Sequence, residues 1–334
     1  MKFAVGYQFQ DAGELFCDML ADYRTAVGEV YFAYPGTASG RPDPGGDPEM
    51  IEQLVYELGE VKKLGIRLDL LLNANCYGGG AVSAELEREI VGIVSALAGR
   101  GVPPEIVTTT SPFAAAMVKK HFPRIELRAS VNLRLDSTLA LEFLADKFDS
   151  FYLRRDLQRD LPTLRRFSDW CRAHGKKLGL LANSGCLRNC PYQTFHDNLV
   201  AHDAEVRERE NVRDFLPHLC WERFRKREHL SDFLRGSWLR PEEIAAYSPY
   251  VDFVKLATRQ HASPRLVIAA YAAGRFDGNV FDLTEPCFSA AAAPFILDNT
   301  RLAVGDLPGA CASECRHCGK CEGVLEKALR RLEL

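Results

Sequence analysis

Hydrophobic residues follow two alternating periods along this chain. Short apolar runs, which are typical of buried strands, are each followed by a longer segment with apolar residues every three or four positions, and this alternation repeats eight times. The order predicts eight βα units around a parallel sheet. The strands are expected at residues 2–7, 29–34, 67–73, 105–109, 125–131, 150–153, 177–182 and 252–256.

Two helical segments show the periodicity most clearly. One lies within residues 51–64 and the other within residues 86–97, and each carries a single apolar face. The faces consist of Ile51, Leu54, Val55, Leu58 and Val61, and of Leu86, Ile90, Ile93, Val94 and Leu97. Eight units, with no G-x-G-x-x-G after the first strand, favour a closed (β/α)8 barrel of the TIM type over an open dinucleotide-binding sheet.

The regular spacing fails between the seventh and eighth strands, which are separated by about seventy residues. Long insertions in barrels are usually functional. We therefore predict a barrel domain over residues 1–275, with an insertion at 183–250 that carries cysteines, and a C-terminal extension over 276–334.

Composition narrows the class of protein. With 47% hydrophobic residues, 26% charged residues and a net charge of −3, the chain resembles a soluble globular protein. No apolar run is long enough to span a bilayer and the first residues do not resemble a signal peptide, so we expect no membrane insertion and a cytoplasmic location. Only a local patch could hold RNA, and the net basic segment 222–230 is the candidate.

The chain has eleven cysteines, and most of them are clustered. In a large cytosolic protein clustered thiols indicate a metal rather than a disulfide framework. Cys186 and Cys190 follow the seventh strand, at the end of the barrel where barrel enzymes keep their chemistry, and Cys220 lies in the same insertion. Cys76 follows the third strand on the same face. By contrast, Cys17 and Cys171 fall in helical patterns and are expected to be buried.

A second group of cysteines lies in the C-terminal extension. Its spacing, C-x3-C-x2-C-x2-C, lets one loop fold around a metal. Iron–sulfur and zinc both suit four thiolates, and Cys287 could replace the first member of the run. The predicted ligands of this second centre are Cys311, Cys315, Cys318 and Cys321.

Two stretches also carry a family resemblance. SGCLRNCPYQTFHDNLVAH, followed by SWLRPEEIAAYSPYVDFVKLATR, resembles the cluster-binding and last-strand region of U32 peptidase-like (collagenase-like protease) barrels. The resemblance implies a [4Fe-4S] cluster held in part by the C-x3-C pair. We expect its ligands to be Cys186, Cys190 and Cys220, with Cys76 as the fourth and Cys287 as its competitor.

The resembled family contains proteases and also proteins for oxygen-independent hydroxylation of ubiquinone, tRNA or ribosomal RNA, several of which are thought to use prephenate as the oxygen donor. The His-Gly-Ala peptidase signature of the family is absent from this sequence. This absence argues against proteolysis and marks the chain as a divergent relative.

Polar residues at strand ends supply the candidate catalytic groups. Lys255 and Arg259 end the eighth strand, and the guanidinium of Arg259 could bind a carboxylate with two hydrogen bonds. His196 could donate a proton near the cluster, or serve as an ordinary structural residue. Asn183, like Asn73 and Asn132, could line a polar pocket or only satisfy loop amides.

Together these features predict an iron–sulfur enzyme with one or two clusters, the second of which could instead be zinc. We expect it to carry out a hydroxylation-like modification of a small molecule, a quinone precursor or RNA, with a carboxylate-bearing substrate or oxygen donor. The alternatives are a U32-type peptidase and a non-catalytic electron-transfer or scaffold protein. A redox partner or a homologous barrel subunit would fit either of the iron–sulfur roles.

Overall fold

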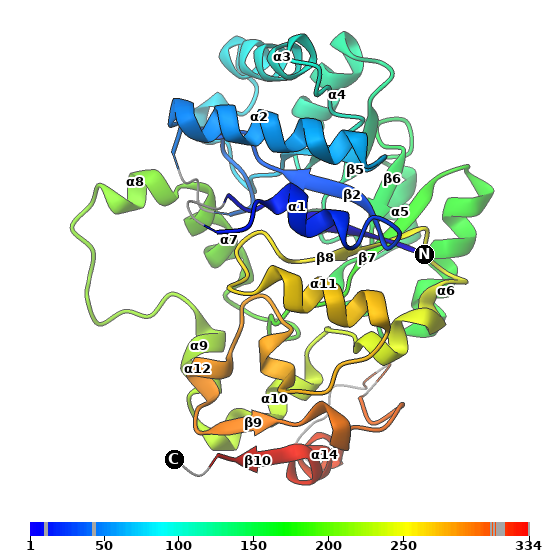
Figure 1. Cartoon of the computed structure of the whole chain (residues 1–334), viewed down its shortest axis with the longest axis vertical. Helices are drawn as coiled ribbons and strands as arrows, with labels where there is room; N and C mark the ends of the chain where they lie inside the picture. Colours follow the sequence, from blue (N-terminus) through cyan, green and yellow to red (C-terminus); the bar gives the residue numbers. More distant parts are fainter. Residues whose placement is uncertain (10–12, 42–44, 308, 310, 312–317, 333–334) are drawn as a thin grey trace.

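Eight parallel strands form a closed barrel, in which each strand pairs with the next and the last pairs with the first (Figure 1). The computed structural model describes residues 1–9, 13–41, 45–307, 309, 311 and 318–332. All eight predicted strands are confirmed, within two residues at each end. They are β1 (Lys2–Gly6), β2 (Val27–Phe32), β3 (Arg67–Leu72), β4 (Ile106–Thr109), β5 (Glu126–Ala129), β6 (Ser150–Tyr152), β7 (Lys177–Leu181) and β8 (Phe253–Leu256).

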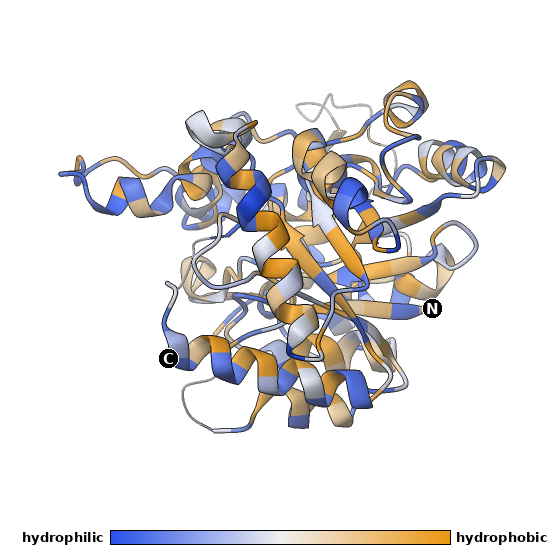
Figure 2. Cartoon of the chain, turned by 90° about the horizontal axis from the view of Figure 1, so that it is seen from above, coloured by the Kyte–Doolittle hydropathy of each residue, from blue (hydrophilic) through white to orange (hydrophobic). Residues whose placement is uncertain are grey.

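Helices surround the barrel and turn their apolar faces towards it. Both predicted faces pack inward, apart from Ile51, which is only half-buried. Capping fixes where these helices begin: the Asp47 side chain accepts from the Glu49 amide, and that of Ser83 from the Leu86 amide. Figure 2 shows mostly hydrophobic strands at the centre and helices of mixed colour around them. The helices are α1 (Phe16–Ala21), α2 (Pro48–Lys63), α3 (Ala84–Gly99), α4 (Pro112–His121), α5 (Thr138–Glu142), α6 (Leu161–Ala173) and α11 (Pro264–Ala273).

None of the helices in the described part of the chain combines the length and the apolar character that a bilayer-crossing segment needs. The longest of them, α2 and α3, have 16 residues each and carry charged residues.

The predicted insertion and the C-terminal extension share a second hydrophobic core. Phe224, Phe233 and Trp238 of the insertion pack with Phe288 and Leu325 of the extension, below the barrel in Figure 1. The boundary at residue 275 stays a prediction. The elements are α7 (Gln193–Ala201), α8 (Asp203–Arg207), α9 (Leu219–Phe224) and α10 (Ser231–Arg235) before β8, and α12 (Ser289–Ala292), β9 (Phe295–Leu297), α14 (Lys320–Ala328) and β10 (Leu329–Arg331) after it.

Inside the barrel, charged side chains replace part of the usual aliphatic filling. The fully buried guanidinium of Arg128 donates to Glu29 at 2.6 Å and to Glu126 at 3.1 Å, and it lies 3.6 Å from Asp69. It also covers the ring of Phe253 at 3.9 Å. Because a buried charge must be paired to be tolerated, these carboxylates and Arg128 depend on one another.

Replacing Arg128 with Met should therefore leave carboxylates buried without their counter-ion, and should lower the free energy of unfolding by about 3 to 5 kcal/mol. Arg67→Met is the matched control. Arg67 pairs with the same Glu29 and Glu126 but is 38% exposed, so its loss should cost about 1 kcal/mol or less. Urea denaturation of both variants measures the difference, and equal losses would contradict a central role for Arg128.

Candidate functional site at the barrel mouth

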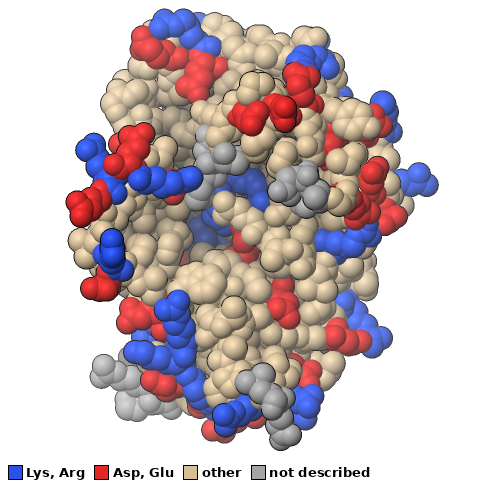
Figure 3. Space-filling view, turned by 60° about the vertical axis from the view of Figure 1, so that its left-hand side comes forward, with Lys and Arg blue, Asp and Glu red and all other residues tan. Residues whose placement is uncertain are grey.

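Basic side chains converge where the barrel strands end. Arg41 comes from the loop after β2, Arg155 from the segment after β6, and Lys255 and Arg259 from β8 and its following loop. These positions come together because all parallel strands of a barrel end on one face. Figure 3 shows Lys and Arg side chains gathered on the floor of a hollow. Elsewhere on that face, positive and negative side chains are mixed.

Lys255 lies deepest of these groups and is only 8% exposed. Its ammonium lies 3.7 Å from the centre of the Tyr31 ring. Burial, reinforced by Arg259 and Arg41, holds the pKa of Lys255 well below its usual range, although the nearby Asp69 carboxylate opposes this shift. A lysine with a lowered pKa can accept or release a proton where an ordinary lysine stays charged.

One buried carboxylate organises the arginines of the mouth. Glu285 accepts from Arg41 at 2.6 and 3.1 Å, and its second oxygen accepts from the Gln260 amide at 3.2 Å. Arg259 donates to the hydroxyl of Ser39 at 3.1 Å. Arg41 and Glu285 were missed by the sequence analysis, since both lie in irregular segments; only the position of Arg41 just beyond β2 could have indicated it.

Three of the predicted cluster ligands lie near one another beside this basic group. Cys186 accepts a hydrogen bond from Arg155 at 3.1 Å. Burial raises the pKa of the Cys220 thiol to about 12, and its neighbours Cys186 and Cys190 add to the shift. Three neighbouring thiols have the chemistry that a thiophilic metal or an iron–sulfur cluster requires. Among the described residues, however, no three His, Cys, Asp or Glu side chains are arranged as a finished metal site.

The C-terminal cysteines are only partly described. Cys315 lies outside the described residues, Cys318 is exposed, and Cys321 packs against the second core. Cys311 lines a cavity of about 320 Å³ together with Cys190. The extension therefore brings one of its cysteines to the thiol group of the insertion, and the second metal centre stays a prediction.

Cys76 has different neighbours. Its sulfur accepts from the Gly78 amide at 3.4 Å and interacts with the imidazole of His202, and these two contacts lower the pKa of the thiol. The same interaction, together with Glu205, raises the pKa of His202. The structure thus places Cys76 against a histidine, and its role as the fourth cluster ligand stays a prediction.

His196 and Asn183 have well-defined surroundings. The ring of His196 packs edge to face on His218 with centroids 4.5 Å apart, and burial, helped by His218, lowers the pKa of His196 to about 4. A neutral imidazole is a base rather than an acid at neutral pH. The amide of fully buried Asn183 bonds the backbone of Ala257 twice and that of Leu283 once. These bonds hold loop ends together, and the catalytic roles of both residues stay predictions.

Other basic residues near the mouth are neutralised locally. Arg134 pairs with Asp197, and Arg154 with Asp156. In the segment considered for RNA, Arg223 pairs with Asp232 and Arg227 with Glu322. Arg155 differs from Arg134 and Arg154, because its guanidinium contacts the sulfur of Cys186.

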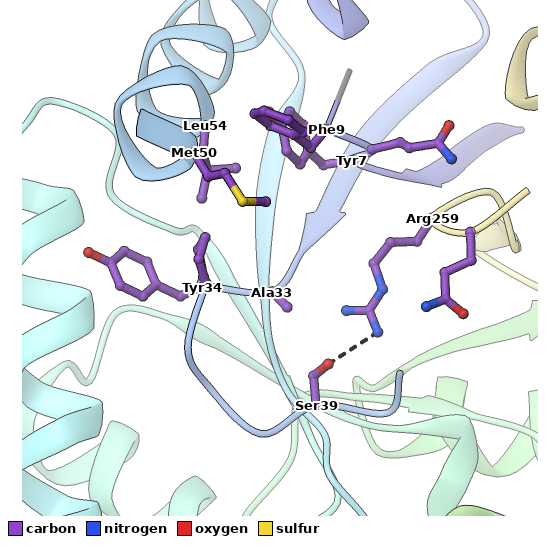
Figure 4. A pocket seen from close by; sticks show the side chains of 11 residues that line it. Tyr7, Phe9, Ala33, Tyr34, Ser39, Met50, Leu54 and Arg259 are labelled. Atoms are coloured by element: carbon purple, nitrogen blue, oxygen red, sulfur yellow. Dashed lines mark hydrogen bonds between the residues drawn. The ribbon is translucent and has the colours of Figure 1, made fainter. Parts of the chain in front are cut away.

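An amphiphilic cavity of about 390 Å³ adjoins the mouth. In Figure 4 the guanidinium of Arg259 and the hydroxyl of Ser39 bound one side, and Leu54 and Met50 from α2 lie across from them. Its remaining walls include the aromatic side chains of Tyr7, Phe9 and Tyr34. The cavity can therefore hold the apolar part of a ligand whose anionic end meets Arg259.

Comparison with known proteins tests the predicted family resemblance. No family model matches the sequence. The chain is 26% identical over 284 residues to the uncharacterized protease MJ1657 of Methanocaldococcus jannaschii, covering 84% of this chain and 82% of the relative. The solved U32 peptidase Mk0906 shares the fold, with a TM-score of 0.54 and 15% identity over 77% of this chain and 92% of that one. The chain is therefore similar to the U32 peptidase-like barrels, at the distance expected of a divergent relative.

The predicted family resemblance is thus confirmed. For this U32-like barrel, the structural match at 15% identity establishes the architecture alone. Its chemistry must be argued from the side chains at the mouth.

His196 and His202, two of the histidines in the insertion, should titrate on opposite sides of the ordinary imidazole range. His196 should deprotonate near pH 4 because it is buried beside His218, and His202 above the ordinary value of about 6.5 because Glu205 stabilises its charged form. Proton NMR of the ring resonances, assigned with His196→Gln and His202→Gln, measures both. Coincident titrations near 6.5 would contradict the packing described.

Proposed function

We propose that this protein is an iron–sulfur enzyme that carries out an oxygen-independent, hydroxylation-like modification of a small anionic substrate at the barrel mouth. The observation that carries the proposal is a contact between the basic residues of the mouth and the cysteines of the insertion. Arg155, part of the basic mouth, donates directly to the sulfur of Cys186. A redox-capable thiol group and an anion-binding surface are therefore adjacent.

Different residues at the mouth bind different parts of the substrate. The guanidinium of Arg259 holds a carboxylate, and the cavity beside it takes the apolar body of the substrate and excludes water. Arg41 is anchored by Glu285 and adds positive charge without blocking this cavity. The electrostatic field of the mouth thus selects for anions.

Lys255 supplies the proton chemistry. Its amine is buried below the mouth, between the ring of Tyr31 and the charged network around Asp69. We infer that Lys255 moves a proton to or from the substrate. A thiolate-bound cluster supplies single electrons when present. The ligands available from this chain are Cys186, Cys190 and Cys220, with Cys76 or a cysteine of the extension as the fourth.

Peptidase activity is the second candidate, and the names of the two relatives favour it. A non-catalytic electron carrier is favoured less by the geometry, because the amphiphilic cavity bounded by Arg259 suits substrate binding rather than electron transfer.

Metal analysis tests the cofactor. Protein purified without oxygen should contain iron and acid-labile sulfide, and replacing both Cys186 and Cys190 with Ala should remove most of the mouth-associated iron. Cys171→Ala is the control, because that thiol is buried in the barrel core. Truncation after Gly309 removes the four C-terminal cysteines, so any metal lost on truncation is assigned to the extension. Iron content that is unchanged in the double variant would refute the proposed ligands.

Substrate binding is tested by Arg259→Ala. The loss of a charge-assisted contact costs about 1.5 to 3 kcal/mol, so turnover should fall by about ten- to 150-fold while iron content is retained. Arg154→Ala is the control, since Arg154 pairs with Asp156 outside the cavity. Hydroxylated metabolites, quinones and RNA nucleosides are compared in anaerobic cells carrying each form. Identical profiles for wild type, Arg259→Ala and no protein would reject the proposed reaction.

A further inference from the structure

A second group of reactive side chains lies on the rim of the barrel, where the loop after β3 meets the insertion. Cys76 follows β3, His202 follows α7, and Glu205 lies on α8. We propose that these three residues form a hydrolytic site in which Cys76 is the nucleophile, His202 the base and Glu205 the orienting carboxylate. The proposal goes beyond the redox function above and gives the peptidase candidate a site of its own.

The contacts have the order that an activated cysteine requires. Glu205 bonds Nδ1 of His202 at 3.0 Å, which leaves the other ring nitrogen for the thiol of Cys76 in the same cavity. The Gly78 amide donates to the sulfur at 3.4 Å. A thiol against an imidazole that is itself held by a carboxylate is the arrangement of cysteine hydrolases, whatever their fold.

The thiol is accessible to a ligand. Cys76, His202 and Glu205 line one cavity of about 340 Å³, together with the three glycines at 78–80. A side chain built at Gly79 would meet no atom within 4 Å. The glycine segment therefore leaves open space through which an extended chain could approach the sulfur.

Charge indicates the substrate class. The walls of this cavity carry the carboxylates of Glu85, Glu89 and Glu205, and no Lys or Arg is among the residues that line it. This is the reverse of the barrel mouth, where arginines dominate. We therefore assign to the rim site an amide or peptide substrate with a positively charged side chain next to the bond that is cleaved.

The chemistry needs no further reagent than water. The Cys76 sulfur attacks the carbonyl carbon to form a thioester, the carbon–nitrogen bond breaks, and protonated His202 gives its proton to the leaving amine. A water molecule then gives a proton to His202 and its oxygen to the acyl group, which releases the acid and restores the thiol. Glu205 keeps the imidazole in the required orientation throughout.

Alkylation kinetics test the activated thiol directly. Iodoacetamide labelling at neutral pH, with each cysteine followed by mass spectrometry, should modify Cys76 fastest, because a thiolate stabilised by an imidazole is more reactive than a neutral thiol, whether that thiol is buried or, like Cys318, exposed. His202→Ala should slow this labelling about tenfold or more, and Glu205→Gln should slow it less. Glu208→Gln is the matched control on the same segment, outside the cavity. Equal Cys76 rates in wild type and His202→Ala would overturn the proposal.

Turnover and iron content separate this site from the cluster. Benzoyl-arginine aminomethylcoumarin should be hydrolysed and its benzoyl-glutamate counterpart should not. Cys76→Ala should abolish hydrolysis and leave the iron content unchanged. The double replacement of Cys186 and Cys190 should lower the iron content and leave hydrolysis intact. No hydrolysis of the arginine amide would overturn the hydrolytic role. Loss of iron in Cys76→Ala would show that Cys76 is a cluster ligand and not a nucleophile, and it would leave the redox proposal intact.

Discussion

Closure of the barrel by pairing of β1 with β8 is the constraint on which the other features depend. Because all strands run in one direction, closure brings the loops after β2, β6, β7 and β8 to a single face. Residues more than 200 positions apart, such as Arg41 and Glu285, thereby form a salt bridge at 2.6 Å. The site is thus a product of topology, and no local sequence motif contains it.

Electrostatic balance differs between the interior and the mouth. In the interior, Arg128 is surrounded by Glu29, Glu126 and Asp69, so its charge is compensated and the network stabilises the barrel. At the mouth positive charge is in excess, because the single buried carboxylate of Glu285 interacts with two arginines, Arg41 and Arg259. An unbalanced positive site of this kind favours an anionic ligand, which is the physical basis of the proposed substrate class.

The sequence predicted the architecture well, because strand and helix periodicities depend on neighbours a few positions apart. It also pointed to Lys255 within β8, to Arg259 just beyond that strand and to the thiols of the one irregular gap, and the roles of these residues stay predictions. It did not predict the pairing of Arg41 with Glu285, or the core that joins Phe233 of the insertion to the extension. Those contacts depend on how loops fold back in three dimensions, and periodicity carries no such information.

The central claim is that thiol-held iron and an anion site are neighbours at the barrel mouth. Electron paramagnetic resonance of the anaerobically purified, dithionite-reduced protein tests it most directly, with prephenate added as a carboxylate probe. The account predicts an iron–sulfur signal whose shape changes on addition of the probe in wild type and does not change in Arg259→Ala. The absence of any iron–sulfur signal, or a response to prephenate that is the same in both proteins, would contradict it.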